Sequence, residues 1–220
     1  MRHLSEAHEV ARRRSPAKAP QALAFGADRL WMGSWETQRI YALKPESFAI
    51  EEEANAPGRP VGMTWTGDDL RVVCSETADD HRVIRRYAPG RGFVMPEAIP
   101  CPDDTGSFLA FDGIHLWLSQ RYNQRVLEFD ARYEVISEIA ADAQILGALW
   151  SGGHLYLSTW HGREGGCKIA RTDARSRTLE YVASMSFAAV SLAHDGARFW
   201  TNDSRDSAIV AFTLPKDPLA

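Results

Sequence analysis

The chain has 220 residues and a formal net charge of -4 at pH 7, and 45% of its residues are hydrophobic. These values are typical of a globular protein and exclude a disordered tail, a collagen-like chain and a coiled coil. The near-neutral charge argues against a protein that binds nucleic acid by neutralising phosphates. No segment approaches the ~20 apolar residues of a membrane span, and the N-terminus has no apolar signal region. We therefore expect a cytoplasmic protein with no nucleic-acid and no membrane partner.

One nine-residue segment recurs five times along the chain. Each copy has an apolar residue at the second position, an aromatic residue or His at the fourth, and Leu or Phe at the ninth. The copies are ALAFGADRL (22–30), GMTWTGDDL (62–70), FLAFDGIHL (108–116), GALWSGGHL (147–155) and SLAHDGARF (191–199). Their ninth positions are 39 to 46 residues apart, which is about the length of one four-stranded propeller blade.

The remainder of each repeat also has the character of strands. The shared Leu or Phe begins a second strand rich in aromatic and branched residues, such as LWMG or LYLS. A polar loop follows, then a third strand such as RIYAL or RVLEF and a more polar fourth strand such as YEVISEI. The sequence therefore predicts an all-β fold, a five-bladed β-propeller of four-stranded antiparallel blades. We place this domain at 20–220, with blades that start near residues 21, 61, 107, 146 and 190.

The fifth repeat ends near Leu214 without a fourth strand of its own. We expect the N-terminal arm, residues 1–19, to supply the missing outer strand with its segment from about 4 to 10, LSEAHEV, which resembles YEVISEI. An open ring would leave a strand edge and an apolar face uncovered. A frayed or helical basic arm is the alternative, and the basic run Arg12 to Arg14 is interpreted as a solvated connection.

The loops between the second and third strands are expected to converge on one mouth of the central channel. They run over 34–38, 74–82, 119–124, 158–166 and 202–207, and they differ strongly while the strands around them repeat. Loops of this kind place the functional site on a scaffold. The residues that we predict to bind a small-molecule substrate, in these loops and at the start of the first blade, are Gln21, Trp35, Glu36, Arg121, Tyr122, Trp160 and Arg205.

Three residues of these loops are candidates for proton transfer. His161 is the predicted general acid or base, because an unperturbed imidazole titrates near neutral pH. Glu76 or Asp203 would orient His161 or share the proton transfer. The alternative is that all these side chains are ordinary exposed loop residues and that the two tryptophans merely cap the channel.

The sequence contains no motif typical of a cofactor. Cys74, Cys101 and Cys167 are too scattered for a disulfide framework or a paired zinc motif, so we expect reduced thiols and no cofactor. We assign no metal ligands, although the fold could in principle gather Asp79, Asp80, His81 and His161. Cys74, near the mouth, is the thiol to test as a nucleophile.

The repeat of apolar-small-aromatic-x-Gly-x-x-Leu-Trp, a polar loop and Arg-Ile/Val-x-x-aromatic resembles the NHL-type blades of glutaminyl cyclotransferase, virginiamycin B lyase and gluconolactonase-like propellers. The resemblance covers about residues 20–214, and the count of five blades is most similar to the glutaminyl cyclotransferases. It implies that Gln21 stands at the Gln of their motif Phe-Thr-Gln-Gly-Leu. The catalytic Glu of that family falls on Met32, so pyroglutamate formation would require Glu36 or Glu76 at the same point. The metal ligands of gluconolactonase-like proteins have no matching residues.

These observations together predict an enzyme of the lyase, hydrolase or cyclotransferase type that acts on a small polar metabolite. Acid and base residues at one mouth of the channel would carry the reaction. The alternative is a propeller without catalytic activity that binds a ligand or a protein at this mouth or at its outer rim. We expect a monomer or a weak homo-oligomer.

Overall fold

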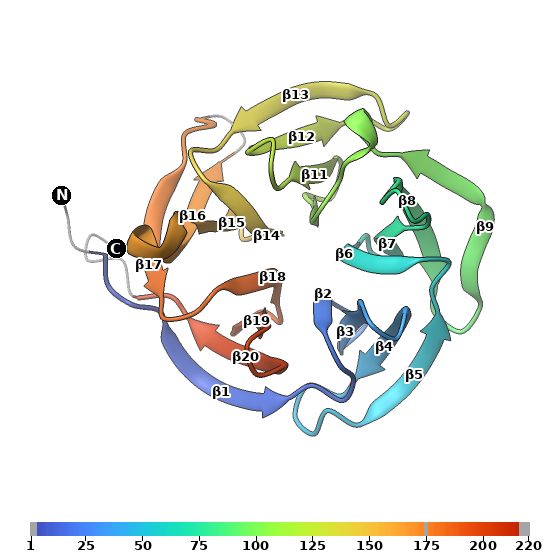
Figure 1. Cartoon of the computed structure of the whole chain (residues 1–220), viewed down its shortest axis with the longest axis horizontal. Coiled ribbons are helices and arrows are strands. Elements are labelled where there is room, and N and C mark those ends of the chain that lie inside the picture. The colour runs from blue at the N-terminus through green and yellow to red at the C-terminus, as the bar shows by residue number, and fades with distance from the viewer. Residues whose placement is uncertain (1–3, 174–175, 216–220) are drawn as a thin grey trace.

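The computed structural model describes residues 4–173 and 176–215, which form five four-stranded antiparallel sheets arranged around a central axis (Figure 1). The predicted five-bladed all-β propeller is therefore confirmed. Residues 1–3 of the predicted arm, and residues 174–175 and 216–220 of the predicted propeller domain, lie outside the described residues. Within the described ranges, no helix has the length and apolar character needed to cross a membrane.

Four blades consist of consecutive strands that run from the channel to the rim. The first blade contains β2 (Pro20–Gly26), β3 (Arg29–Ser34), β4 (Arg39–Leu43) and β5 (Ile50–Asn55), and the second contains β6 (Arg59–Trp65), β7 (Leu70–Ser75), β8 (Arg82–Ala88) and β9 (Gly92–Pro100). The third contains β10 (Leu109–Phe111), β11 (Leu116–Gln120), β12 (Arg125–Phe129) and β13 (Val135–Ala140), and the fourth contains β14 (Gln144–Ser151), β15 (His154–Trp160), β16 (Cys167–Asp173) and β17 (Glu180–Met185). A 3-10 turn (Pro102–Asp104) and the one-turn helix α1 (Gly162–Gly165) connect strands.

The fifth blade is completed by the N-terminal strand. Its order is β18 (Ala189–His194), β19 (Phe199–Asp203), β20 (Ala208–Thr213) and β1 (His8–Arg14), and Figure 1 shows β1 on the rim beside β20. The two strands pair antiparallel, from His8 opposite Thr213 to Arg14 opposite Ala208. Closure of the ring by an N-terminal strand is thus confirmed.

The position of the closing strand differs from the predicted segment 4–10. Residues 5–7 bond instead to the edge of β17 in the fourth blade, where the Ala7 N–H donates to the Ser184 carbonyl at 2.9 Å and the Ser184 N–H donates to the Ser5 carbonyl at 3.0 Å. The pairing with β20 therefore begins only at His8. The basic run Arg12 to Arg14 lies within this strand, so its interpretation as a connection is wrong.

Neighbouring blades pack through the aromatic positions of the repeat. Trp31 on β3 stacks on Trp65 of the second blade with ring centroids 6.2 Å apart, and Trp117 on β11 stacks on Trp150 of the fourth blade at 5.6 Å. The indole N–H of Trp31 donates to the Gly26 carbonyl, and that of Trp117 donates to the Asp112 carboxylate, each at 3.1 Å. Buried indoles contribute large apolar contact areas, and because their N–H groups are hydrogen-bonded, they avoid the free-energy penalty of an unpaired buried donor. The repeat thus encodes the contacts between blades as well as the strands.

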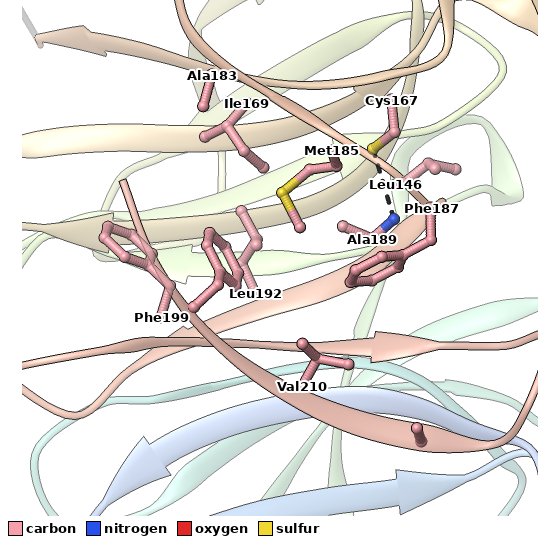
Figure 2. Packing of buried hydrophobic residues seen from close by; sticks show 12 residues of the cluster. Leu146, Cys167, Ile169, Ala183, Met185, Phe187, Ala189, Leu192, Phe199 and Val210 are labelled. Atoms are coloured by element: carbon pink, nitrogen blue, oxygen red, sulfur yellow. Dashed lines mark hydrogen bonds between the residues drawn. The ribbon is translucent and has the colours of Figure 1, made fainter. Parts of the chain in front are cut away.

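The joint between the fourth and fifth blades is filled by aliphatic, aromatic and sulfur-containing side chains (Figure 2). Ile169 and Cys167 of β16 belong to the same buried cluster as Phe199 and Val210 of the last blade. The Ala189 N–H lies 3.4 Å from the Cys167 sulfur, as the dashed line in Figure 2 marks. The segment that carries the chain from β17 into the closing blade contributes Phe187 to this cluster.

A buried ionic contact ties the closing strand to its blade. The side chain of Asp203, at the end of β19, is 1% exposed, and its Oδ2 accepts hydrogen bonds from Arg12 Nη1 at 3.0 Å and from Arg205 Nη2 at 2.9 Å. Arg12 also contacts Asp206 at 2.9 Å. Burial alone would raise the pKa of Asp203, but hydrogen bonds from Arg205 and Arg12 outweigh it and hold the pKa below its usual range. Asp203 is therefore ionised at neutral pH and helps to fix β1.

We expect Asp203→Asn to lower the free energy of unfolding by about 2–3 kcal/mol, because it leaves a buried site without its charge-assisted hydrogen bonds. Asp206→Asn is the matched control, since Asp206 contacts the same arginine but its side chain is 52% exposed, and we expect a loss below about 1 kcal/mol. Urea denaturation of both variants measures the difference. Equal losses would show that the Asp203 contact does not hold the ring.

The same contact makes the stability depend on pH. The folded-state pKa of Asp203 lies below its unfolded value of about 3.9, so its contribution is fully present above about pH 4 and is lost as the pH falls through the folded-state pKa. The difference in free energy of unfolding between the native protein and Asp203→Asn should shrink as the pH is lowered from about 5 to about 2. A difference that stays constant across this range would contradict the assignment.

Candidate functional site

A cavity of about 640 Å³ lies at one mouth of the channel. Its walls come from the loops after β3, β11 and β19, from the start of β8, from the inner strands of the first two blades and from the segment between β1 and β2. Four of the five predicted loops thus contribute to one cavity. The loop over 158–166 does not line it.

A bulge at the start of the inner strands turns side chains towards this mouth. The ladder between β2 and β3 skips Gln21, and the ladder between β6 and β7 skips Val61 at the equivalent place. A bulged residue leaves the pairing and re-aims its side chain, and both residues line the cavity. Gly62 beside Val61 has no room for a side chain, because a Cβ there would lie 2.2 Å from the Ser107 carbonyl oxygen. The close approach of neighbouring blades therefore requires glycine at this point.

Five of the predicted substrate-binding residues line the cavity together: Gln21, Trp35, Glu36, Arg121 and Tyr122. The guanidinium of Arg59 lies over the Trp35 ring at 5.1 Å from its centroid, and that of Arg121 lies over the Tyr122 ring at 5.2 Å. Such cation–π contacts stabilise flat, partly exposed rings. The structure thus brings an aromatic wall, an amide, a carboxylate and a guanidinium to one place.

The other two predicted substrate-binding residues lie elsewhere. Trp160 packs against the buried cluster between the fourth and fifth blades. Arg205 is paired with Asp203. Neither is part of the cavity lining, so the predicted pair of tryptophan walls reduces to Trp35.

The three predicted catalytic residues are not brought together. Glu76 forms two hydrogen bonds with Arg85, at 2.7 and 2.8 Å, and Arg85 also donates to the Met95 carbonyl of the outer strand β9. Asp203 is held by Arg12 and Arg205, as described above. None of Glu76, Asp203 and His161 lines the cavity. Their catalytic roles stay predictions, and each side chain has its own partners in a different blade.

His161 belongs to a polar cluster on the fourth blade. Its Nε2 lies 3.1 Å from Thr159 Oγ1, and its ring contacts the Tyr181 ring at 5.2 Å between centroids. The Tyr181 hydroxyl donates to the Asp142 carboxylate. Burial and the nearby Lys168 lower the pKa of His161 below its usual value, and Asp142 offsets this only in part. The imidazole is therefore neutral at pH 7 and is fixed by local contacts.

Three basic side chains of the cavity were not among the predicted site residues, namely Arg14, Lys18 and Arg82. Arg14 is the last residue of the closing strand β1, and Lys18 lies in the segment that then crosses to the first blade. The basic run was visible in the sequence, but its place at the mouth follows only from the register of β1 on β20. Arg82 ends one of the predicted loops, where its guanidinium donates to the Gly106 carbonyl at 2.6 Å and to Asp80 at 2.5 Å.

The residues considered for a metal site have other partners. His81 Nδ1 lies 2.9 Å from Asp104 Oδ1, and Asp80 is bound to Arg82. Within residues 4–173 and 176–215, no group of three or more His, Cys, Asp or Glu side chains is arranged to hold a metal ion.

The three cysteines are buried free thiols. Burial raises the pKa of the Cys74 thiol far above its usual value, with a further contribution from Glu76. Burial also raises the pKa of Cys101 to about 12 and that of Cys167 to about 11. Thiols with these pKa values carry almost no thiolate near neutral pH, and the thiolate is the nucleophile.

Solved structures of other proteins share this architecture. The glutaminyl cyclase of Myxococcus xanthus superposes with a TM-score of 0.73 and 12% sequence identity, over 96% of this chain and 98% of that chain. A virginiamycin B lyase from Staphylococcus aureus superposes with a TM-score of 0.54 and 18% identity, over 91% of this chain and 68% of that chain. No family model and no curated protein sequence matches the chain. The propeller resemblance indicated by the repeats is confirmed at the level of the fold, and the similar structures include enzymes.

We expect iodoacetamide to leave all three cysteines of the native protein unmodified over a time that fully alkylates the urea-unfolded chain, because the thiols are buried and protonated. Mass spectrometry of the two samples measures the modification. Rapid alkylation of Cys74 in the native state would contradict its buried position and restore it as a candidate nucleophile.

Proposed function

We propose that the protein is a small-molecule enzyme of the lyase, hydrolase or cyclotransferase type, and that its reaction takes place in the cavity at the channel mouth. The observation that carries this proposal is the cavity itself. Its volume of about 640 Å³ lies within the range of small-molecule sites. It combines an aromatic wall with a carboxylate and several cations. The variable loops supply Trp35, Glu36, Arg82 and Arg121, whereas Arg14 and Lys18 come from β1 and the segment after it. The presence of a glutaminyl cyclase and a lyase among the similar folds supports an enzyme, although a shared fold does not by itself fix the chemistry.

Glu36 is the group that we assign to proton transfer. The family position of the catalytic Glu is occupied by Met32, whose side chain is fully buried with its sulfur 3.0 Å from the Ser15 hydroxyl. Of the two carboxylates that the resemblance leaves open, Glu36 lines the cavity with Gln21, whereas Glu76 is bound to Arg85. These positions favour Glu36 over Glu76 as the residue that transfers protons.

The surroundings of Glu36 suit this role. Its side chain is 56% exposed, and it pairs with Lys18 at 3.3 Å, which is itself 78% exposed. An exposed pair of this kind contributes little free energy, so the carboxylate is free to turn towards a bound molecule. As a base it would take one proton from the substrate, and as an acid it would return one to the leaving group.

A second candidate function is ligand binding without catalysis. The observation that favours it is the shortage of acid and base groups in the cavity. Among the described lining residues Glu36 is the one carboxylate, and the three predicted catalytic residues lie elsewhere. A lone carboxylate with basic neighbours is also what a binding site for a charged ligand contains.

The test uses three substrate classes, namely a peptide with an N-terminal glutamine, a sugar lactone and virginiamycin B, with products identified by mass spectrometry. We expect turnover of one class, and Glu36→Gln should reduce kcat by about 100-fold or more, the usual loss of a general acid or base. Glu134→Gln, an exposed carboxylate in the loop after β12, is the matched control and should retain activity.

Full activity of Glu36→Gln would contradict the role of Glu36. Absence of turnover in all three classes would favour the binding function, provided that a compound from the panel raises the melting temperature of the native protein but not that of Trp35→Ala.

A further inference from the structure

We infer that the substrate carries an anionic group, a carboxylate or a phosphate, and that Arg121 binds this group in the mouth cavity. The inference rests on the proposed function, since it names the substrate class of the same cavity. Its basis is the excess of cationic side chains around the cavity and the unsatisfied guanidinium of Arg121.

The lining of the cavity is strongly basic. Among its described residues, four side chains are cationic, namely Arg14, Lys18, Arg82 and Arg121, and one is a carboxylate, Glu36. The whole chain has a net charge of -4, so this cluster does not follow from a basic composition. Cations gathered in a concave site concentrate the field and attract anions.

Internal ion pairs account for only part of this charge. Lys18 is paired with Glu36, and Arg82 is bound to Asp80 at 2.5 Å. Arg14 and Arg121, in contrast, have no carboxylate partner among the residues that the structure describes. Two positive charges at the mouth are therefore available to a ligand.

Arg121 is the more constrained of these two cations. Its Nε is buried and has no hydrogen-bond partner within the described part of the chain, and its Nη2 lies 3.4 Å from Gln144 Oε1, which is long for a hydrogen bond. Its backbone N–H donates to Ser107 Oγ at 3.2 Å, and its guanidinium lies over the Tyr122 ring. The side chain is thus held beside the cavity while its donors remain largely unused.

Unused donors on a partly desolvated cation cost free energy, which a bound oxyanion would offset. A guanidinium presents its N–H groups in a planar fork that matches the two oxygens of a carboxylate or a phosphate. The geometry of Arg121 therefore favours an oxyanion over a neutral polar group.

The remaining walls define the rest of the ligand. The cavity is much larger than a single inorganic anion, and Trp35 and Tyr122 give it aromatic surface. Flat aromatic walls bind ring-like or planar groups through large contact areas. The substrate class is accordingly a small organic acid or phosphate ester with a planar apolar part.

The experiment compares benzoate, phenyl phosphate and benzamide by isothermal titration calorimetry at low ionic strength. Benzoate or phenyl phosphate should bind at one site, and the preferred member of this pair identifies the anionic group. Benzamide, which has the same ring without the charge, should bind at least about tenfold more weakly. Added salt should weaken the binding of the anions but not that of benzamide.

Arg121→Gln should weaken anion binding by about tenfold or more, which corresponds to the loss of charge-assisted hydrogen bonds. Arg121→Lys keeps the charge but not the planar fork and should give an intermediate affinity. Arg132→Gln removes the same charge from an exposed residue after β12 and should bind like the native protein. Circular dichroism and the melting temperature check that each variant is folded.

Three results would overturn the inference: no binding of either anion by the native protein, an affinity for benzamide equal to that for the preferred anion, or unchanged anion affinity in Arg121→Gln. Equal binding of benzamide that is lost in Trp35→Ala would leave the proposed function intact, with a neutral substrate. Anion binding that depends on Arg121, without turnover of any substrate class, would contradict the proposed enzyme and uphold the anionic ligand.

Discussion

The pairing of β1 with β20 closes the ring, and both the packing of the last blade and the position of the mouth cavity follow from it. Among the described residues, the C-terminal part of the chain supplies three strands of the last blade. Without β1, the edge of β20 and the apolar cluster beside it would be open to water. The same strand brings Arg12 to the buried Asp203 and ends at Arg14. The segment that then leads to β2 of the first blade lines the mouth cavity. The strand that closes the ring therefore also positions part of the cavity wall.

Most of the architecture was predictable from the sequence because the period is encoded residue by residue. The fourth-position aromatics, such as Trp65 and Trp150, pack between blades, and the shared Leu or Phe is the first or second residue of each second strand. The exact closing strand was not predictable. The N-terminal segment contacts the edges of two strands, β17 through residues 5–7 and β20 from His8 onwards. The residue pattern of 4–10 does not show where the change from one edge to the other occurs.

The site was predictable only in part, because loop sequences show which residues are present but not which partners they have. Four of the five variable loops contribute to one cavity, and Trp35, Glu36 and Arg121 line it together. Glu76 is hydrogen-bonded to Arg85, and the position of the Arg85 side chain depends on the pairing of β8 with β9. Lys18 and Arg14 reach the cavity from a segment outside the repeat. Long-range partners of this kind follow from the closed ring and have no local trace in the sequence.

Ring closure creates a basic mouth cavity, and we propose that Arg121 binds an anion in it. A crystal structure of the native protein soaked with phenyl phosphate would show where the anion binds. We expect density for the phosphate group within hydrogen-bond distance of the Arg121 guanidinium, with the ring beside Trp35. A fully occupied ligand elsewhere on the molecule, with the cavity empty or with Arg121 paired to a carboxylate of its own chain, would contradict it.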